Sequence, residues 1–165
     1  MNLFRWFNRP SRQRAATKSE AVIRRVVQSF RWPTMEVEPG LWSVTAERRN
    51  TYQVSLFLWA QDESICCMAG CEIAIERDLI PRELALMLLE ENHRFEEGSF
   101  RLVPRDEKRL VVLGRTIDTR TFPEQDMHHL GEVLIEHMQR MVCKLYGMEL
   151  IISGSEQPER RSQRH

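Results

Sequence analysis

The stretch from Gly98 to Tyr146, GSFRLVPRDEKRLVVLGRTIDTRTFPEQDMHHLGEVLIEHMQRMVCKLY, decides the fold of this 165-residue chain. Its second half carries apolar residues at spacings of four, four, three and four, and these are Leu130, Leu134, Met138, Met141 and Leu145. Such spacings place all of these side chains on one side of a helix with 3.6 residues per turn. The pattern therefore predicts a long amphipathic helix whose apolar side is buried against the rest of the chain.

Both ends of this helix carry sequence signals. Thr121 and Glu124 fit an S/T-x-x-E capping box, and Pro123 lies where the first helical turn does not need an amide donor. Gly147 suits the position that follows the last helical residue. The predicted helix has about 24 residues and is roughly 36 Å long, because each residue adds about 1.5 Å. It is long enough to cross a small domain.

The chain before this helix predicts a sheet that can receive it. Runs of alternating apolar residues are separated by short polar turns, a pattern typical of antiparallel strands. The expected strands are 41–48, 52–60, 65–75, 98–103 and 109–118. Residues 35–38 are expected to form only a short extended segment.

Two further helices complete the expected fold. One begins at a capping box formed by Thr17 and Glu20 and ends before Pro33, and the other runs from Pro81 to about Asn92. The sequence therefore predicts an α+β fold. It consists of an antiparallel five-stranded sheet, built from a three-stranded meander and a hairpin, with three helices in the order α-β-β-β-α-β-β-α.

Composition divides the chain into one domain with two polar ends. We expect a basic flexible arm at 1–16, a single domain at 17–152 and a disordered tail at 153–165. The arm also carries an aromatic cluster, Phe4, Trp6 and Phe7, among its arginines. We interpret the arm as a mobile tail, and the alternative is a segment that binds a membrane surface or a partner.

The formal net charge is zero, but the charge is distributed unevenly. Residues 32–155 hold 13 basic and 21 acidic side chains, a net charge of −8, whereas residues 1–31 hold eight basic and one acidic. An acidic body repels phosphates, so we expect no nucleic-acid partner. No apolar run approaches the roughly 20 residues of a transmembrane helix, and the N-terminal residues do not resemble a secretory signal. We therefore expect a cytoplasmic protein.

Motifs for catalysis and cofactor binding are missing from the sequence. There is no G-x-G-x-x-G, P-loop or G-x-S-x-G pattern. Cys66 and Cys67 point to opposite faces of an expected strand, which disfavours zinc, and His93 with Glu96 and Glu97 is expected to be a solvated helix end. We predict no enzymatic activity, no metal and no cofactor. A hydrolase or metalloenzyme that uses His93 or the cysteines is the alternative.

Apolar residues outside the expected core indicate a surface that binds protein. The second face of the sheet carries Phe57, Trp59 and Met68, and Leu86 and Leu89 lie off the buried stripe of their helix. This apolar area exceeds what an exposed face normally carries. Two methionines of the long helix are added as candidate binding residues, because Met packs against varied apolar segments. They are Met138 and Met141, and ordinary core filling is the alternative for both.

The order of the elements and the local sequence pattern of 19–146 resemble the type III secretion chaperone-like fold, which the YbjN-like family of bacterial proteins shares. The resemblance is carried by Ser99-Phe100-Arg101-Leu102, by Leu110-Val111-Val112-Leu113-Gly114 and by Thr121-Phe122-Pro123-Glu124 with the helix that follows. It implies a homodimeric, non-enzymatic protein that presents hydrophobic surfaces to an extended polypeptide segment.

The expected function is therefore that of a protein-binding domain that holds an extended client segment as a homodimer. Strand addition at a sheet edge and docking in an apolar groove are both open as binding modes. The alternative is a YbjN-like regulatory or signalling accessory protein whose basic arm at 1–16 contacts a membrane surface or an acidic partner.

Overall fold

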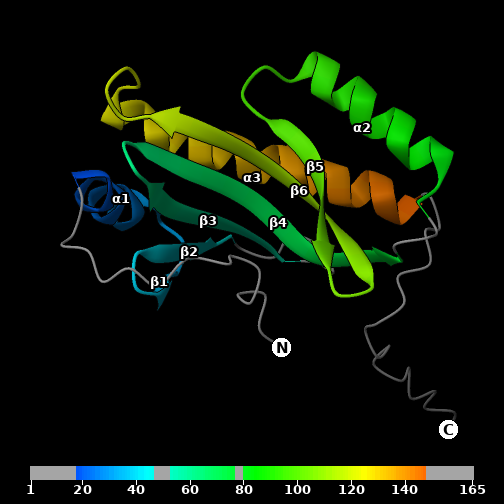
Figure 1. The fold of residues 1–165 in the computed structure, drawn as a ribbon, viewed down its shortest axis with the longest axis horizontal. Helices are drawn as coiled ribbons and strands as arrows, with labels where there is room; N and C mark the ends of the chain where they lie inside the picture. The colour runs from blue at the N-terminus through cyan, green and yellow to red at the C-terminus, as the bar shows by residue number, and fades with distance from the viewer. Residues whose placement is uncertain (1–17, 47–52, 77–79, 148–165) are drawn as a thin grey trace, which may run out of the picture.

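Residues 18–46, 53–76 and 80–147 are the part of the chain that the computed structural model describes. The helices are α1 (Lys18–Ser29), α2 (Arg82–Arg94) and α3 (Glu124–Gly147). The strands are β1 (Thr34–Glu38), β2 (Leu41–Thr45), β3 (Val54–Gln61), β4 (Ser64–Glu76), β5 (Ser99–Arg105) and β6 (Lys108–Asp118). All of these strands form one antiparallel sheet in the order β1-β2-β3-β4-β6-β5 (Figure 1).

The α+β class is confirmed, but the described sheet has six strands and not the predicted five. The additional strand is β1, which pairs with β2 from Thr34 opposite Val44 to Glu38 opposite Leu41. Gly40 has a φ of 74° in the tight turn between the two strands, a conformation that suits glycine. β1 has only five residues and buries none of them, and its alternation is limited to Met35 and Val37, too short to distinguish a strand from an extended segment.

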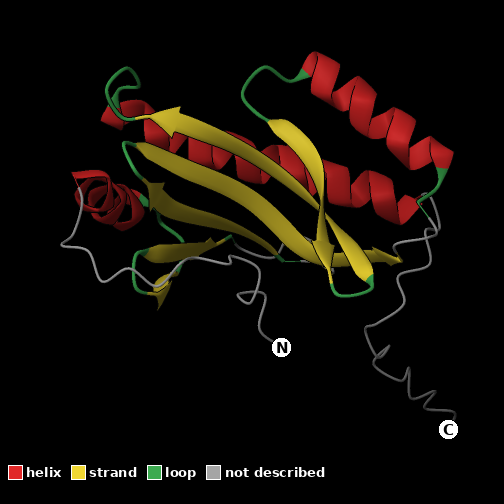
Figure 2. Cartoon of the chain, viewed as in Figure 1, coloured by secondary structure: helices red, strands yellow, loops and turns green. Residues whose placement is uncertain are grey.

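Helices α1 and α3 pack on the same face of the sheet, which we call the helix face. Figure 2 shows α3 running along the sheet behind β4 and β6. The predicted stripe of α3 is buried, and it packs against Leu56, Cys67 and Leu113 in one continuous core. Apolar residues of α1 join the same core, and these are Val22, Ile23, Val26 and Val27. The hydrophobic pattern of both helices therefore determined which side of each is buried.

The bounds of α3 match the prediction, but its start is not built as predicted. The helix begins at Glu124, three residues after Thr121, so Thr121 is not its N-cap. The Thr121 hydroxyl instead lies 3.5 Å from the Asp118 carbonyl oxygen. The Glu124 carboxylate accepts two hydrogen bonds of 2.7 Å from the Arg25 guanidinium, which lowers the pKa of Glu124. A contact with α1 thus replaces the local capping box.

Three predicted features lie outside the described residues. They are the arm at 1–16, the capping residue Thr17 and the tail at 153–165.

Candidate protein-binding surface

The strand register defines a second face of the sheet, opposite the helix face. Residues that lie opposite each other in antiparallel pairs share a face. One row across this face contains Met35, Ser43, Phe57, Met68, Gly114 and Ser99, and the next contains Leu41, Trp59, Cys66 and Thr116. Helices α1 and α3 pack on the other side, so within the described ranges this face carries no helix along its centre.

The sheet residues predicted to bind protein do lie together on the second face. Phe57 and Met68 are direct neighbours across β3 and β4, and Trp59 lies in the adjoining row. Phe57 is buried with 6% of its surface exposed, whereas Trp59 and Met68 are half-buried. The partly exposed Trp59 and Met68 are thus the members of this group that offer contact area.

The predicted helix residues divide into two pairs with different environments. Leu86 and Leu89 are 48% and 65% exposed on the outer side of α2, while Leu84 and Leu88 of the same helix are buried. Met138 and Met141 are 0% and 1% exposed in the core between α3 and the sheet. Ordinary core filling, the alternative, describes these two methionines, and they offer no surface to a partner.

The two edges of the sheet differ in how their backbone groups are satisfied. At β5, the Asn92 side chain of α2 bonds the backbone of Phe100 twice: its Nδ2 donates to the carbonyl oxygen at 3.0 Å, and its Oδ1 accepts from the amide at 2.5 Å. These are the two bonds that a neighbouring strand would make. Pro104, four residues along the same strand, has no amide hydrogen to offer. The β5 edge is therefore largely closed to another strand.

The β1 edge has the opposite character. The Pro33 carbonyl accepts a bond of 2.9 Å from the Thr45 amide, so Pro33 and Met35 face β2. By alternation, the backbone groups of Thr34 and Glu36 point away from the sheet. Met35 is 56% exposed on the second face, the largest exposed apolar side chain of the described strands. β1 thus combines an outward-facing backbone with an exposed apolar residue.

Two residues of this surface were missed by the sequence analysis. Met35 was placed in a short extended segment, because β1 shows no alternation of buried residues. Asn92 was assigned only to the end of a helix. A polar residue in the last turn of a helix gives no signal of its own, because its bond to Phe100 depends on how α2 sits beside β5.

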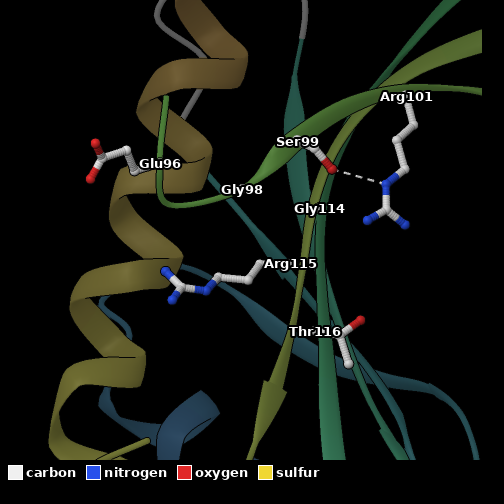
Figure 3. Close-up of a pocket in the computed structure, with 7 residues that line it drawn as sticks. All are labelled: Glu96, Gly98, Ser99, Arg101, Gly114, Arg115 and Thr116. Atoms are coloured by element: carbon white, nitrogen blue, oxygen red, sulfur yellow. Dashed lines mark hydrogen bonds between the residues drawn. The ribbon is translucent and has the colours of Figure 1, made fainter. Parts of the chain in front are cut away.

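A hollow of about 360 Å³ lies beside the start of β5, where β6 extends beyond its partner strand. It is lined by Glu96, Gly98, Ser99, Arg101, Gly114, Arg115 and Thr116 (Figure 3). The two arginines point away from each other, and each has a partner in the chain: Arg101 donates to the Ser99 hydroxyl and Arg115 forms an ion pair with Glu97. Its polar groups do not converge on one point.

Two titratable side chains of the described ranges have pKa values shifted by burial. Burial raises the pKa of the Cys67 thiol to about 12, which makes it a poor nucleophile. His137 lies against the Phe95 ring, and burial lowers its pKa. No group of three or more His, Cys, Asp or Glu side chains in the described ranges is placed to hold a metal ion. No described helix is both long and apolar enough to cross a membrane.

A comparison with solved structures finds a similar fold in a chain of the "Crystal Structure of the ExsC-ExsE Complex". The two sequences are 13% identical, and the similarity covers 84% of this chain and 98% of that chain with a TM-score of 0.49. This likeness concerns the fold alone. Neither a protein-family model nor a curated protein matches the sequence.

Proposed function

We propose that this protein is a non-enzymatic protein-binding domain that holds an extended client segment as a homodimer. The observation that carries the proposal is the position of the helices. α1 and α3 bury one face of the sheet, and the other face presents Met35, Trp59 and Met68 with partial exposure. Apolar side chains at that density on a sheet face are typical of an interface.

The outer side of α2 is the proposed dimer surface. Leu86 and Leu89 are three residues apart and therefore neighbours on the helix, and both are largely exposed. Arg82 and Glu90 flank them on the exposed part of the helix. In an antiparallel pair of α2 helices the leucines of each copy face those of the other, and Arg82 of one copy approaches Glu90 of its partner. Such a surface is self-complementary, as a two-fold dimer requires.

Light scattering of the purified chain tests the dimer. We expect a homodimer at micromolar concentration, and we expect Leu86→Glu with Leu89→Glu to give a folded monomer, because the added carboxylates would be buried against each other. Gln28→Glu, which adds a carboxylate to the exposed side of α1, is the matched control. A wild-type chain that is strictly monomeric would remove the dimer from the proposal.

Recovery of the tagged protein from extracts of its own source tests client binding. We expect one stoichiometric protein, identified by mass spectrometry, to be lost with Met68→Glu and kept with Met68→Leu. The leucine variant preserves apolar volume on the second face, whereas the glutamate variant places a charge there. Recovery of the homodimer alone at every salt concentration would contradict the client-holding role.

The regulatory alternative gains support from the outer side of α1. Lys18 and Arg24 are exposed on α1 and Arg31 is exposed just after it, and they continue the basic composition of the arm at 1–16. If the regulatory alternative holds, the full chain should sediment with anionic phosphatidylglycerol vesicles and not with neutral ones. Removal of residues 1–16 would abolish the sedimentation while the fold is kept.

A further inference from the structure

We propose that the outer edge of β1 takes up a basic, extended segment of the client as an added strand. The inference rests on the proposed client-binding function and specifies which edge is used and which charge the client carries. β1 and β5 are the terminal strands of the described sheet, so a new strand has two edges to choose from.

Backbone geometry excludes most of the β5 edge. Ser99, Arg101 and Val103 pair toward β6, because Phe100 directs its amide and carbonyl to Asn92 on the other side. The outward positions of β5 are therefore Phe100, Leu102 and Pro104. Asn92 occupies the first, and the third has no amide hydrogen. Only Leu102 retains both outward groups, and one residue cannot anchor a strand.

β1 offers two consecutive outward positions. Thr34 and Glu36 both direct an amide and a carbonyl away from β2, since the bond between Thr45 and Pro33 fixes the alternation. A strand that added here would make up to four main-chain hydrogen bonds. Its side chains would also extend the row that already contains Met35, Phe57 and Met68 on the second face. The edge and the apolar face would act as one binding surface.

Charge selects a basic segment. β1 carries Glu36 and Glu38, both exposed, and no basic residue. The Glu36 carboxylate accepts a bond of 2.7 Å from the Gly40 amide. The nearest basic residue along the chain, Arg31, lies over the Trp32 ring outside the strand. Opposite charges on neighbouring strands stabilise their pairing, and like charges oppose it.

Two synthetic peptides test the inference: acetyl-(Lys-Val)4-amide as the basic probe and acetyl-(Glu-Val)4-amide as its acidic counterpart. Amide hydrogen exchange of the isotope-labelled full chain is measured by NMR with each. We expect the basic peptide to slow exchange at Thr34 and Glu36 and to leave Leu102 unchanged. We expect Thr34→Pro to weaken binding about tenfold, because it removes one outward donor while Pro33 and Met35 still pair with β2.

Two control variants separate edge pairing from loss of the fold. Thr34→Val keeps the amide and the branched shape, so we expect wild-type affinity. Leu102→Pro removes the matching outward donor from β5, and we expect wild-type affinity there as well. Equal binding of both peptides, absence of binding, or slowed exchange at Leu102 would overturn the inference. The inference would also be overturned if the amides of Thr34 and Glu36 were protected from exchange in the peptide-free chain and lost this protection when residues 1–16 were removed. The arm would then occupy the β1 edge.

The outcome is distinguishable from that of the proposed function. A client that still co-purifies with Thr34→Pro would leave the client-holding role intact and exclude the β1 edge. Absence of any client would instead contradict the role itself.

Discussion

Gly131 of α3 lies directly against the Phe30 ring at the end of α1. A Cβ atom added to Gly131 would come within 2.5 Å of Phe30 Cζ and 2.9 Å of a Leu56 methyl group. The second contact places Gly131 against Leu56 of β3, so glycine at this position sets how closely both helices approach the sheet. Gly131 is one of the places where a small residue is required for packing and not for a special backbone angle.

Replacement of this glycine should therefore destabilise the protein. Gly131→Ala improves helix propensity by about 1 kcal/mol, but overpacking of a filled core costs typically 1–3 kcal/mol. We expect a net loss of about 1 kcal/mol in the free energy of unfolding, measured by urea denaturation. Phe30→Leu in the same chain removes the ring and should recover part of the loss. A more stable Gly131→Ala single variant would show that the two helices can separate freely.

Asn92 should stabilise the chain through the two hydrogen bonds it makes with Phe100. Asn92→Ala leaves the Phe100 amide and carbonyl without these partners in a partly buried position, and the expected cost is about 1–3 kcal/mol in urea denaturation. Asn92→Asp keeps the acceptor and loses the donor, so its cost should be intermediate at neutral pH. Equal stability of all three chains would mean that water replaces the side chain without loss.

Stability should fall in mildly acidic solution because of His137. Burial is the largest cause of its lowered pKa, with Arg140 next, while Glu136 and Glu91 oppose the shift and Lys144 adds to it. The unfolded chain then binds the proton more readily than the folded one. The contribution is fully present above the unfolded pKa of about 6.5, and it is lost as pH falls from there toward the lower folded pKa.

Thermal unfolding as a function of pH measures this effect, and His137→Gln is the variant that isolates it. We expect the melting temperature of the wild-type chain to drop more steeply below pH 6.5 than that of the variant. His129, which is exposed at the start of the same helix, provides the control His129→Gln. Identical pH profiles of wild type and His137→Gln would contradict the assignment.

The cysteines should differ in their reactivity. Cys66, Cys67 and Cys71 are buried and Cys143 is exposed, and burial raises the pKa of Cys67 to about 12. A thiol-specific reagent at pH 8 should label Cys143 first and the other three only on unfolding, as read from the mass of the modified peptides. Fast labelling of Cys67 in the folded protein would mean that the sheet opens at β4.

The periodic parts of the chain could be predicted because their burial repeats along the sequence. Within 130–145 an apolar residue returns to the buried side at every helical turn, and within 65–75 apolar residues alternate as they do in a strand. The bounds of α3 and β4 were therefore predicted nearly correctly. β1 was not, because its apolar alternation is limited to Met35 and Val37 and neither is buried. The capping box at Thr121 was wrong because the helix begins at Glu124, whose carboxylate bonds Arg25, 99 positions away.

By itself, the sequence determined the class of the fold, the long helix and the apolar residues that have to be covered. Only the tertiary structure decided which of them remain accessible: Met138 became core, whereas Leu86 and Leu89 stayed exposed on α2. It also decided that Asn92 closes one edge of the described sheet and that β1 forms the other. The physical reason is that periodicity is a local property, whereas exposure and edge pairing depend on which distant segment packs alongside.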